Sequence, residues 1–288
     1  MDIGIGAPNT VRGVTGRELL EWARKADAAG FSTLATIGAV DYPSYEELTV
    51  FAAAGAVTER IRFLSNVLIA PARSTAELAK QAATTDQLTG GRLTLGLGVG
   101  WRSGDLTLTG RDFSRRGAIF DQQLADLAAA WAGQSVLPNT RAVAPTPVQM
   151  PIPLIIGGTT DAAVRRVVEY GVGWTAGGMA PDAVAEFAAK VRAAWQRAGR
   201  DGAPRVVALA YFSLGNGTEE QSRANIHDYY SPMGDEVATM IAGSALRSPE
   251  AIKGAVEAYA AAGVDELILD PSIGDPAQVD LLAEVAFG

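Results

Sequence analysis

Residues 75–102 read TAELAKQAATTDQLTGGRLTLGLGVGWR, and this stretch decides the fold. It predicts a helix, a turn at Gly90 and Gly91, a buried strand, and a glycine-rich loop where that strand ends. Within the strand, leucines and Val99 alternate with Thr94 and glycines, so that one face is bulky and the other is small. A face without side chains lets a flat ligand approach the backbone, or lets helices pack very closely. The strand by itself leaves both interpretations open.

Composition limits the classes of protein to which the chain can belong. Its 288 residues are 48% hydrophobic and 19% charged, which is typical of packed globular proteins. The net charge of -8 disfavours nucleic acid and anionic membranes as partners. No apolar run has membrane-spanning length and no signal peptide is evident, so we expect a cytoplasmic protein. The chain has no cysteine and one histidine, His227, so thiol catalysis is excluded and we predict no metal site.

Predicted strands and helices alternate along the whole chain. Strands are predicted at residues 3–7, 33–37, 61–69, 93–99, 154–156, 173–175, 206–214 and 266–270. Alanine-rich amphipathic helices are predicted at residues 16–29, 45–58, 75–88, 116–132, 161–170, 182–198, 249–262 and from 276 onward. About eight such units predict an α/β fold of the (β/α)8 TIM barrel type, with a doubly wound open sheet as the alternative. No interior linker interrupts the pattern, so we expect a single domain over residues 1–288.

Capping residues support these boundaries. A hydroxyl residue followed three positions later by glutamate predicts capping boxes at Thr15, Ser44 and Ser74. Ser248 and Asp275 each precede a proline that would occupy the first helical turn. Glycines just past the predicted helices indicate left-handed C-terminal caps at Gly30, Gly90, Gly171 and Gly263.

Two excursions interrupt the alternation, after the fourth and the seventh units. Residues 133–153 carry five prolines, and residues 215–247 carry Tyr229, Tyr230 and Met233. Both are predicted to emerge on the C-terminal face of the barrel, where TIM-barrel enzymes place their sites. A cover over the site, a dimer contact and structural padding stay open as their roles.

Several short motifs follow one another along the chain in a characteristic order. They are ADAAGF at 26–31, the segment 58–101, GRDFSRRGAIFDQQL at 110–124, IPLIIGGTTDAAVRR at 152–166 and GVGW at 171–174. In this order the chain resembles the bacterial luciferase-like monooxygenase family over nearly its whole length. The resemblance implies a (β/α)8 barrel that binds FMN, or the deazaflavin coenzyme F-420, at its C-terminal face. The cofactor performs the redox chemistry in such proteins, while the protein supplies orientation and electrostatics.

The activity implied by the resemblance is that of a flavin-dependent oxidoreductase of the monooxygenase type, acting on paired donors. Its substrate would be a small organic molecule, and a flavin reductase or NAD(P)H would supply the reduced flavin. FMN is preferred to F-420 because no cation stands in the loop after the sixth strand, whereas F-420 carries an acidic tail. The alternatives are an F-420-dependent hydride-transfer enzyme, a non-catalytic flavin-binding protein, and a metal-dependent hydrolase using Asp41, Asp270 and Asp275. The family also implies a homodimer.

Cofactor-binding residues are carried over from the family at several strand ends. Asn66 and Val67 fall where the family has a non-proline cis peptide beside the flavin ring. The residues placed against the flavin or its ribityl chain are Gly98, Gly100, Trp101 and Arg102. The guanidinium of Arg102 would offset phosphate or substrate charge, with a solvated surface arginine as the alternative.

A phosphate site is predicted where the fifth strand meets the next helix. Backbone N–H groups there, together with the helix dipole, suit an anion. The residues of this loop are Gly157, Gly158, Thr159 and Thr160, and a plain helix cap is the alternative. Gly177 and Gly178, after the sixth strand, are placed beside the same phosphate by similarity.

No catalytic residue is identified. Where many relatives have an Asp-His pair after the second strand, this chain has Gly38 and Ala39, which excludes a mechanism with histidine at that position. The candidates for lining the substrate pocket are Asp41, Tyr42, Tyr45, Trp101 and Tyr211. We therefore expect the chemistry to stay with the flavin.

Overall fold

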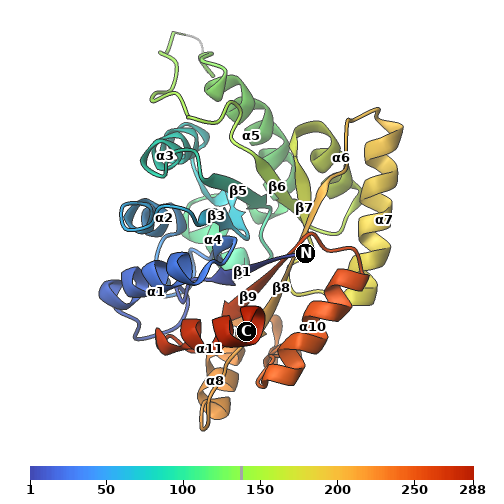
Figure 1. Cartoon of the computed structure of the whole chain (residues 1–288). Coiled ribbons are helices and arrows are strands. Elements are labelled where there is room, and N and C mark those ends of the chain that lie inside the picture. Colours follow the sequence, from blue (N-terminus) through green and yellow to red (C-terminus); the bar gives the residue numbers. More distant parts are fainter. Residues whose placement is uncertain (137–138) are drawn as a thin grey trace.

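The computed structural model describes residues 1–136 and 139–288, and its strands form a closed parallel barrel (Figure 1). The strands are β1 (Asp2–Gly6), β2 (Thr33–Thr36), β3 (Arg62–Ser65), β4 (Leu68–Ile69), β5 (Leu93–Gly98), β6 (Leu154–Gly157), β7 (Gly173–Thr175), β8 (Arg205–Phe212) and β9 (Glu266–Pro271). Strand β3 pairs with both β2 and β5, which closes the sheet. The predicted (β/α)8 TIM barrel is confirmed, and the open sheet is excluded.

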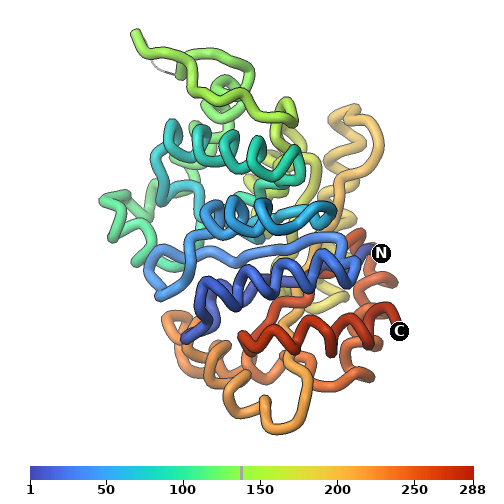
Figure 2. The backbone as a smooth tube through the Cα atoms, turned by 60° about the vertical axis from the view of Figure 1, so that its left-hand side comes forward, coloured from blue at the N-terminus to red at the C-terminus, as the bar shows by residue number. Residues whose placement is uncertain are grey.

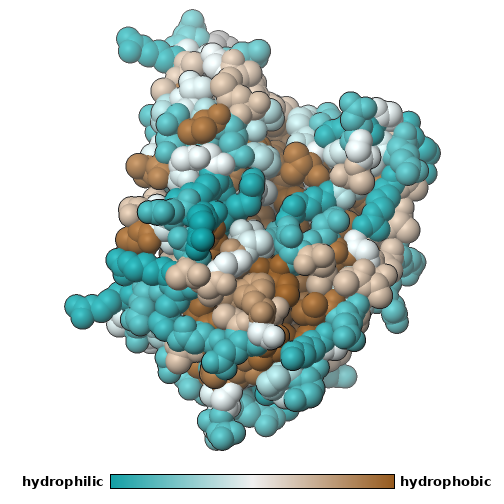
Figure 3. Space-filling view, viewed as in Figure 1, coloured by the Kyte–Doolittle hydropathy of each residue, from teal (hydrophilic) through white to brown (hydrophobic). Residues whose placement is uncertain are grey.

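Helices surround the barrel on its outside. They are α1 (Gly16–Ala29), α2 (Glu47–Gly55), α3 (Thr75–Leu88), α4 (Ser103–Leu108), α5 (Arg116–Trp131), α6 (Asp161–Tyr170), α7 (Pro181–Arg197), α8 (Glu219–Tyr230), α9 (Asp235–Gly243), α10 (Pro249–Ala261) and α11 (Ala277–Phe287). Figure 2 shows α1 and α11 side by side, with both termini at one edge of the molecule. Hydrophilic residues cover much of the rim in Figure 3, and hydrophobic ones gather toward the middle of this face. Among the described residues, no helix is both long and apolar enough to cross a membrane.

The predicted third strand, residues 61–69, is divided into β3 and β4. The division falls at the Asn66–Val67 peptide bond, which is cis. The cis bond that the family resemblance implied at this position is therefore confirmed. Because the third strand is divided into β3 and β4, nine strand segments occupy eight barrel positions.

The two faces of β5 serve different purposes. Leu93, Leu95 and Leu97 are fully buried and belong to the core between strands and helices. On the other face, a Cβ atom on Gly96 would overlap the carbonyl oxygen of Ser65, so a neighbouring strand packs closely here. Gly98 instead lines a cavity. The bare face therefore allows close packing, by a strand rather than a helix, and leaves open space where β5 ends.

Several helix boundaries follow the predicted caps, and others do not. Thr15 forms the predicted capping box, and Ser248 accepts a hydrogen bond from the amide of Ala251. The box at Ser44 is wrong, because its hydroxyl donates to carbonyls within its own turn and Glu46 caps α2 instead. The box at Ser74 is also wrong, since its side chain makes no capping bond.

Gly171 is not a left-handed cap. Its φ is −85°, in the extended region, whereas Gly30 and Gly263 adopt the predicted positive φ. A Cβ atom at Gly171 would lie 3.0 Å from the carbonyl oxygen of Val167. A close approach of backbone, and not handedness, therefore favours glycine there.

The first excursion lies at the opposite end of the barrel from its predicted place. Gln149 bonds to Asp86 and to the carbonyl of Leu93, at the turn between α3 and β5. The turn between α3 and β5 leads into a strand, so it lies at the N-terminal ends of the strands. Residues 133–153 likewise follow helix α5 and lead into β6, so they lie at the same end of the barrel. The prediction of a C-terminal position for this segment was wrong. Residues 137 and 138 of it lie outside the described residues.

The second excursion, residues 215–247, does lie at the C-terminal ends of the strands. It contains α8, α9 and a short 3-10 helix between them, Ser231–Met233. Leu246 then bonds back to the backbone of Tyr211 in β8. The segment leaves from and returns to one strand end, and it covers part of the site described next.

Candidate active site

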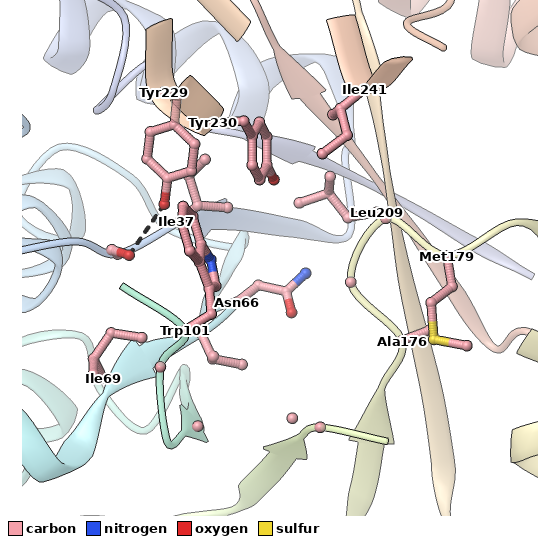
Figure 4. Close-up of a pocket in the computed structure, with 18 of the residues that line it drawn as sticks. Ile37, Asn66, Ile69, Trp101, Ala176, Met179, Leu209, Tyr229, Tyr230 and Ile241 are labelled. Carbon is pink, nitrogen blue, oxygen red and sulfur yellow. Dashed lines mark hydrogen bonds between the residues drawn. The ribbon is translucent and has the colours of Figure 1, made fainter. Parts of the chain in front are cut away.

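A cavity of about 550 Å³ lies at the C-terminal ends of the barrel strands (Figure 4). Its walls come from the ends of β2, β3, β5, β6, β7 and β8, from the loops that follow them, and from α8 and α9. A volume of this size suits a small-molecule ligand, and this end of a TIM barrel is where active sites form. The cavity is therefore the candidate active site.

One wall of the cavity presents backbone instead of side chains. It is formed by Gly98, Gly100, Gly157, Gly158, Gly177 and Gly178, the glycine wall. A Cβ atom on Gly98 would lie 2.7 Å from Val67 Cγ2, and one on Gly100 would lie 2.7 Å from Ile69 Cγ2. Glycine at both positions makes room for these methyl groups, and the two residues present only backbone to the cavity, where a flat group can lie against it.

Asn66 points an unused hydrogen-bond donor toward this cavity. Its Oδ1 accepts a 2.7 Å bond from Thr175 Oγ1, which itself accepts a bond from the Gly177 amide. This arrangement assigns the carbonyl side of Asn66 to the protein. The amide nitrogen Nδ2 is buried without a partner among the described residues, and Figure 4 shows the side chain extending into the pocket. A ligand acceptor at this point would satisfy a donor that is otherwise costly to bury.

The loop after β6 offers backbone amides. In the described part of the chain, the N–H groups of Gly158, Thr159 and Gly178 have no hydrogen-bond partner. Thr160 caps α6, since its hydroxyl accepts from the amide of Ala163. Free amides beside a helix N-terminus form an anion site. The helix cap is therefore present, and the free amides beside it are compatible with the predicted phosphate site.

The structure brings many of the predicted site residues together. Those that line the cavity are Asn66, Val67, Gly98, Gly100, Trp101, Gly157, Gly158, Gly177, Gly178 and Tyr211. The predicted residues outside the lining are Asp41, Tyr42, Tyr45, Arg102, Thr159 and Thr160. Tyr45 is 40% exposed and its hydroxyl donates to the carbonyl of Val14, while the carboxylate of Asp41 packs against Gly104.

Arg102 is neither a solvated residue nor a lining one. It is 5% exposed and donates a 2.8 Å bond to the carbonyl oxygen of Tyr229. Its guanidinium lies 4.6 Å from the ring centroid of Trp101 and also faces the rings of Tyr42 and Tyr229. These contacts attach α8 to the loop after β5.

Sequence reasoning missed several apolar lining residues. They are Ile37, Ile69, Met179, Leu209 and Ile241. Leu209 was detectable, because it lies two residues before Tyr211 on the same face of one strand. Ile241 was not, because the excursion that carries it has no periodicity that points a residue at the site.

The cavity carries no charge of its own. Among the described residues, no Asp, Glu, Lys, Arg or His lines it. Burial raises the pKa of Tyr230 to about 12 and that of Tyr211 well above its usual value, so both phenols are neutral. His227 lies on the surface, paired with Asp235.

A carboxyl group lies inside the barrel beside the cavity. Asp270 is 1% exposed, pairs in register with Tyr211, and occupies the space that a side chain on Gly6 would fill. Neither of its oxygens has a partner among the described residues. Burial raises its pKa well above the usual range, because the charged form would lose its hydration without gaining a partner.

The donor set fits a flavin. The glycine wall presents backbone against which a flat ring system could lie. Asn66 offers a donor for a heteroatom at the edge of that ring system, and the free amides of the loop after β6 could bind a phosphate. No side chain that is ionised at neutral pH lines the cavity in the described residues, so redox chemistry there requires a bound cofactor.

Known proteins match both the sequence and the fold. Residues 1–285 match the family model described as luciferase-like monooxygenase. An uncharacterised protein of Mycobacterium tuberculosis is 32% identical over 208 residues, which span 62% of this chain and 71% of that protein. The FMNH2-dependent dimethylsulfone monooxygenase of Pseudomonas putida is 27% identical over 191 residues, spanning 62% and 52%. A solved secondary alcohol dehydrogenase, dependent on coenzyme F-420, is 18% identical with a TM-score of 0.81, covering 99% of this chain and 97% of that one.

Proposed function

The chain belongs to the luciferase-like monooxygenase family, and from this we propose that it is a flavin-dependent oxidoreductase of the monooxygenase type acting on a small organic substrate. The observation that carries the proposal is the glycine wall facing a charge-free cavity, with the unpartnered amide of Asn66 beside it. A flat, heteroatom-bearing cofactor accounts for both features. A pocket for substrate alone would need neither.

Three groups of residues would hold FMN. The ring system would lie against Gly98, Gly100 and Val67, and Asn66 Nδ2 would donate to a heteroatom of the ring. The free amides of the loop after β6, with the N-terminus of α6, would receive the phosphate. When bound, the flavin accepts a hydride, and in its reduced form it reacts with oxygen. The protein positions the cofactor and excludes water, for which the cover from α8 and α9 is suited.

FMN is the cofactor we favour over coenzyme F-420. In the described residues no cation lines the cavity, so the acidic tail of F-420 would lack a partner where it leaves the site. A single phosphate is adequately met by backbone amides and a helix dipole. The relative from P. putida is named as FMNH2-dependent, whereas the structurally similar alcohol dehydrogenase is named as F-420-dependent. F-420-dependent hydride transfer is accordingly the second candidate.

A flavin reductase is the partner we propose, since a cavity filled by FMN and substrate leaves no evident place for NAD(P)H. The rate of NADPH consumption distinguishes reduced FMN that is supplied by a reductase from FMN that is reduced directly by NAD(P)H on this protein. The protein with FMN and NADPH alone would consume NADPH slowly, and addition of a reductase would make consumption rapid.

Isotope labelling tests the oxygenase reaction. The protein would be given FMN, a flavin reductase, NADPH and ¹⁸O₂, together with a panel of neutral aldehydes, ketones, aromatics and sulfones. We expect one labelled oxygen atom in the product of at least one class, detected by mass spectrometry. FMN that binds but is never reoxidised in a substrate-dependent way would favour a non-catalytic flavin-binding protein. Reduction of F-420 by an alcohol would favour the second candidate.

A further inference from the structure

Four aromatic side chains line one side of the cavity: Trp101, Tyr211, Tyr229 and Tyr230, the aromatic wall. The rings of Trp101 and Tyr230 are nearly parallel, with 15° between their planes and 6.0 Å between their centroids. Tyr211 and Tyr229 meet the Tyr230 ring edge-on, at centroid distances of 6.0 and 5.0 Å. Figure 4 shows Tyr229 and Tyr230 above the pocket and Asn66 below. A wall of this kind offers flat apolar surface to a ring compound.

The surroundings of the aromatic wall exclude an ionised ligand. The cation beside this wall is Arg102, whose guanidinium already donates a hydrogen bond to the carbonyl of Tyr229 and stacks on the ring face of Trp101. The carboxyl of Asp270, the in-register neighbour of Tyr211 on β9, is buried without a partner among the described residues, and burial raises its pKa well above the usual range. An ion bound here would therefore lose its hydration without gaining a counter-charge, which is strongly unfavourable.

The indole N–H of Trp101 makes no hydrogen bond among the described residues, but Trp101 is 39% exposed, so water can satisfy this donor. Among the hydroxyl donors of the wall, one hydrogen remains free. The hydroxyl oxygens of Tyr211 and Tyr230 lie 3.0 Å apart, so one of their two hydrogens forms the bond between them and the other is available. The other hydroxyls that line the cavity are used, because Tyr229 donates to the carbonyl of Gly38 and Ser244 donates to that of Ile241. The Tyr211–Tyr230 pair is thus the place for one ligand oxygen.

Resting on the function proposed above, we infer that the aromatic wall is the substrate subsite. Its ligand is an uncharged ring compound that carries one carbonyl or hydroxyl oxygen, which accepts a hydrogen bond from the Tyr211–Tyr230 pair. The Tyr211–Tyr230 pair and Trp101 determine this specificity, the pair through its free hydroxyl hydrogen and Trp101 through the face of its ring.

Three probes of matched size test the inference: 2-naphthaldehyde, naphthalene and 2-naphthoate. Equilibrium dialysis against the FMN-bound protein measures each dissociation constant without relying on turnover. We expect 2-naphthaldehyde to bind at least tenfold more tightly than 2-naphthoate. The double variant Tyr211→Phe/Tyr230→Phe keeps both rings but removes both hydroxyls, so it should weaken 2-naphthaldehyde about 3- to 10-fold and leave naphthalene unchanged. Trp101→Ala should weaken both neutral probes.

Tyr45→Phe is the matched control, because that hydroxyl bonds to the carbonyl of Val14 outside the cavity. It should change none of the three constants. Equal binding of 2-naphthoate and 2-naphthaldehyde, or an effect of the Tyr211→Phe/Tyr230→Phe double variant that is the same for naphthalene, would overturn the inference while FMN still binds. Failure of FMN to bind in the same samples would instead contradict the proposed function, and the subsite with it.

Discussion

Glycine has different consequences at neighbouring positions of the cavity. Gly158 has φ of +114°, so any side chain there strains the backbone as well as filling the site. Gly178 has no such φ, and a Cβ atom on it would meet only the carbonyl oxygen of Leu209, at 3.9 Å. A substitution at Gly178 therefore separates loss of cofactor space from loss of stability, whereas one at Gly158 does not.

Gly178→Val should weaken FMN binding by about one to two orders of magnitude, because its side chain would occupy open cavity space beside the amide proposed to receive the phosphate and so remove one or two charge-assisted hydrogen bonds. Fluorescence titration measures the affinity, and thermal unfolding checks that the fold persists. Gly254→Ala, on the outside of α10 with open space around it, is the control and should keep full affinity. Undiminished affinity in a folded Gly178→Val protein would place the phosphate elsewhere.

Glu47 shows how one buried carboxylate makes stability depend on pH. It is 4% exposed, fills the space beside Gly38, and pairs with Arg73 at 2.6 Å. Burial raises its pKa to about 7, and the attraction of Arg73 only partly opposes that shift. Because the folded pKa lies above the unfolded one, the folded state holds the proton more strongly. Stability is therefore lost as the pH rises from about 4 through 7.

Glu47→Gln should remove this dependence. Between pH 5 and pH 7.5 the wild-type protein should lose on the order of 2 kcal/mol of unfolding free energy relative to the variant. Urea unfolding of both proteins at the two pH values gives the difference, in which the pH dependence of all other groups cancels. Parallel pH profiles for the two proteins would show that Glu47 does not change its protonation in this range.

The cover formed by α8 and α9 is attached to the barrel near the C-terminal end of α8. Arg102 bonds to the carbonyl of Tyr229, the hydroxyl of Tyr42 donates to Asp228 at 2.6 Å, and the hydroxyl of Tyr229 donates to the carbonyl of Gly38. These contacts reach two different loops, the one after β2 and the one after β5. An element held in this way can open only by giving up several polar contacts together.

Arg102→Met should loosen the cover. The methionine keeps apolar packing but removes a buried charge-assisted bond, so we expect proteolysis within residues 215–247 to accelerate about tenfold or more. Arg223→Met, which breaks an exposed pair with Glu219 on α8, is the control and should have little effect. Cleavage products identified by mass spectrometry locate the opening. Identical rates for the two variants would mean that Arg102 does not hold the cover.

Ligand protection addresses the same element in the unmodified protein. If the excursion closes over the flavin, adding FMN should slow its cleavage at constant oligomeric state. Cleavage that ignores FMN but varies with protein concentration would assign the segment to a contact between subunits.

Elements were predictable where a local pattern determines them. Hydrophobicity with a period of 3.6 located α1, α3 and α6 at their observed bounds, although the caps predicted at Ser74 and Gly171 did not form. The division of the third strand was not visible in its apolar run, because side-chain alternation carries no information on a peptide bond isomer. The end of the barrel at which residues 133–153 lie follows from their position after a helix, and overlooking that order produced the wrong face.

Site residues on regular strand ends were likewise predictable, and those that depend on tertiary contacts were not. The glycines of the glycine wall stand at the last residue of a strand or within three residues after it, and they line the cavity. Asp41 and Tyr45 belong to the loop after β2, whose path is set by bonds to Asp105 and Val14. No sequence pattern encodes those distant partners, which is why both residues were misplaced.

At the scale of the whole molecule, the resemblance to the family implies a homodimer, and this stays a prediction. We expect sedimentation equilibrium to give about twice the chain mass of 29.9 kDa. A single species at the monomer mass at micromolar concentration would contradict it. Because the barrel strands contribute the glycine wall within one chain, we expect dilution to monomers to preserve FMN binding.

The central claim is that the cavity at the C-terminal ends of the strands is a flavin site that accepts FMN. Titration of the apoprotein with FMN and, separately, with coenzyme F-420 tests it most directly, with quenching of cofactor fluorescence as the signal. We predict saturable binding of one FMN per chain, weakened by Gly178→Val and unaffected by Gly254→Ala. Tight binding of F-420 with no binding of FMN would contradict our choice of cofactor, and binding of neither would contradict the proposed function.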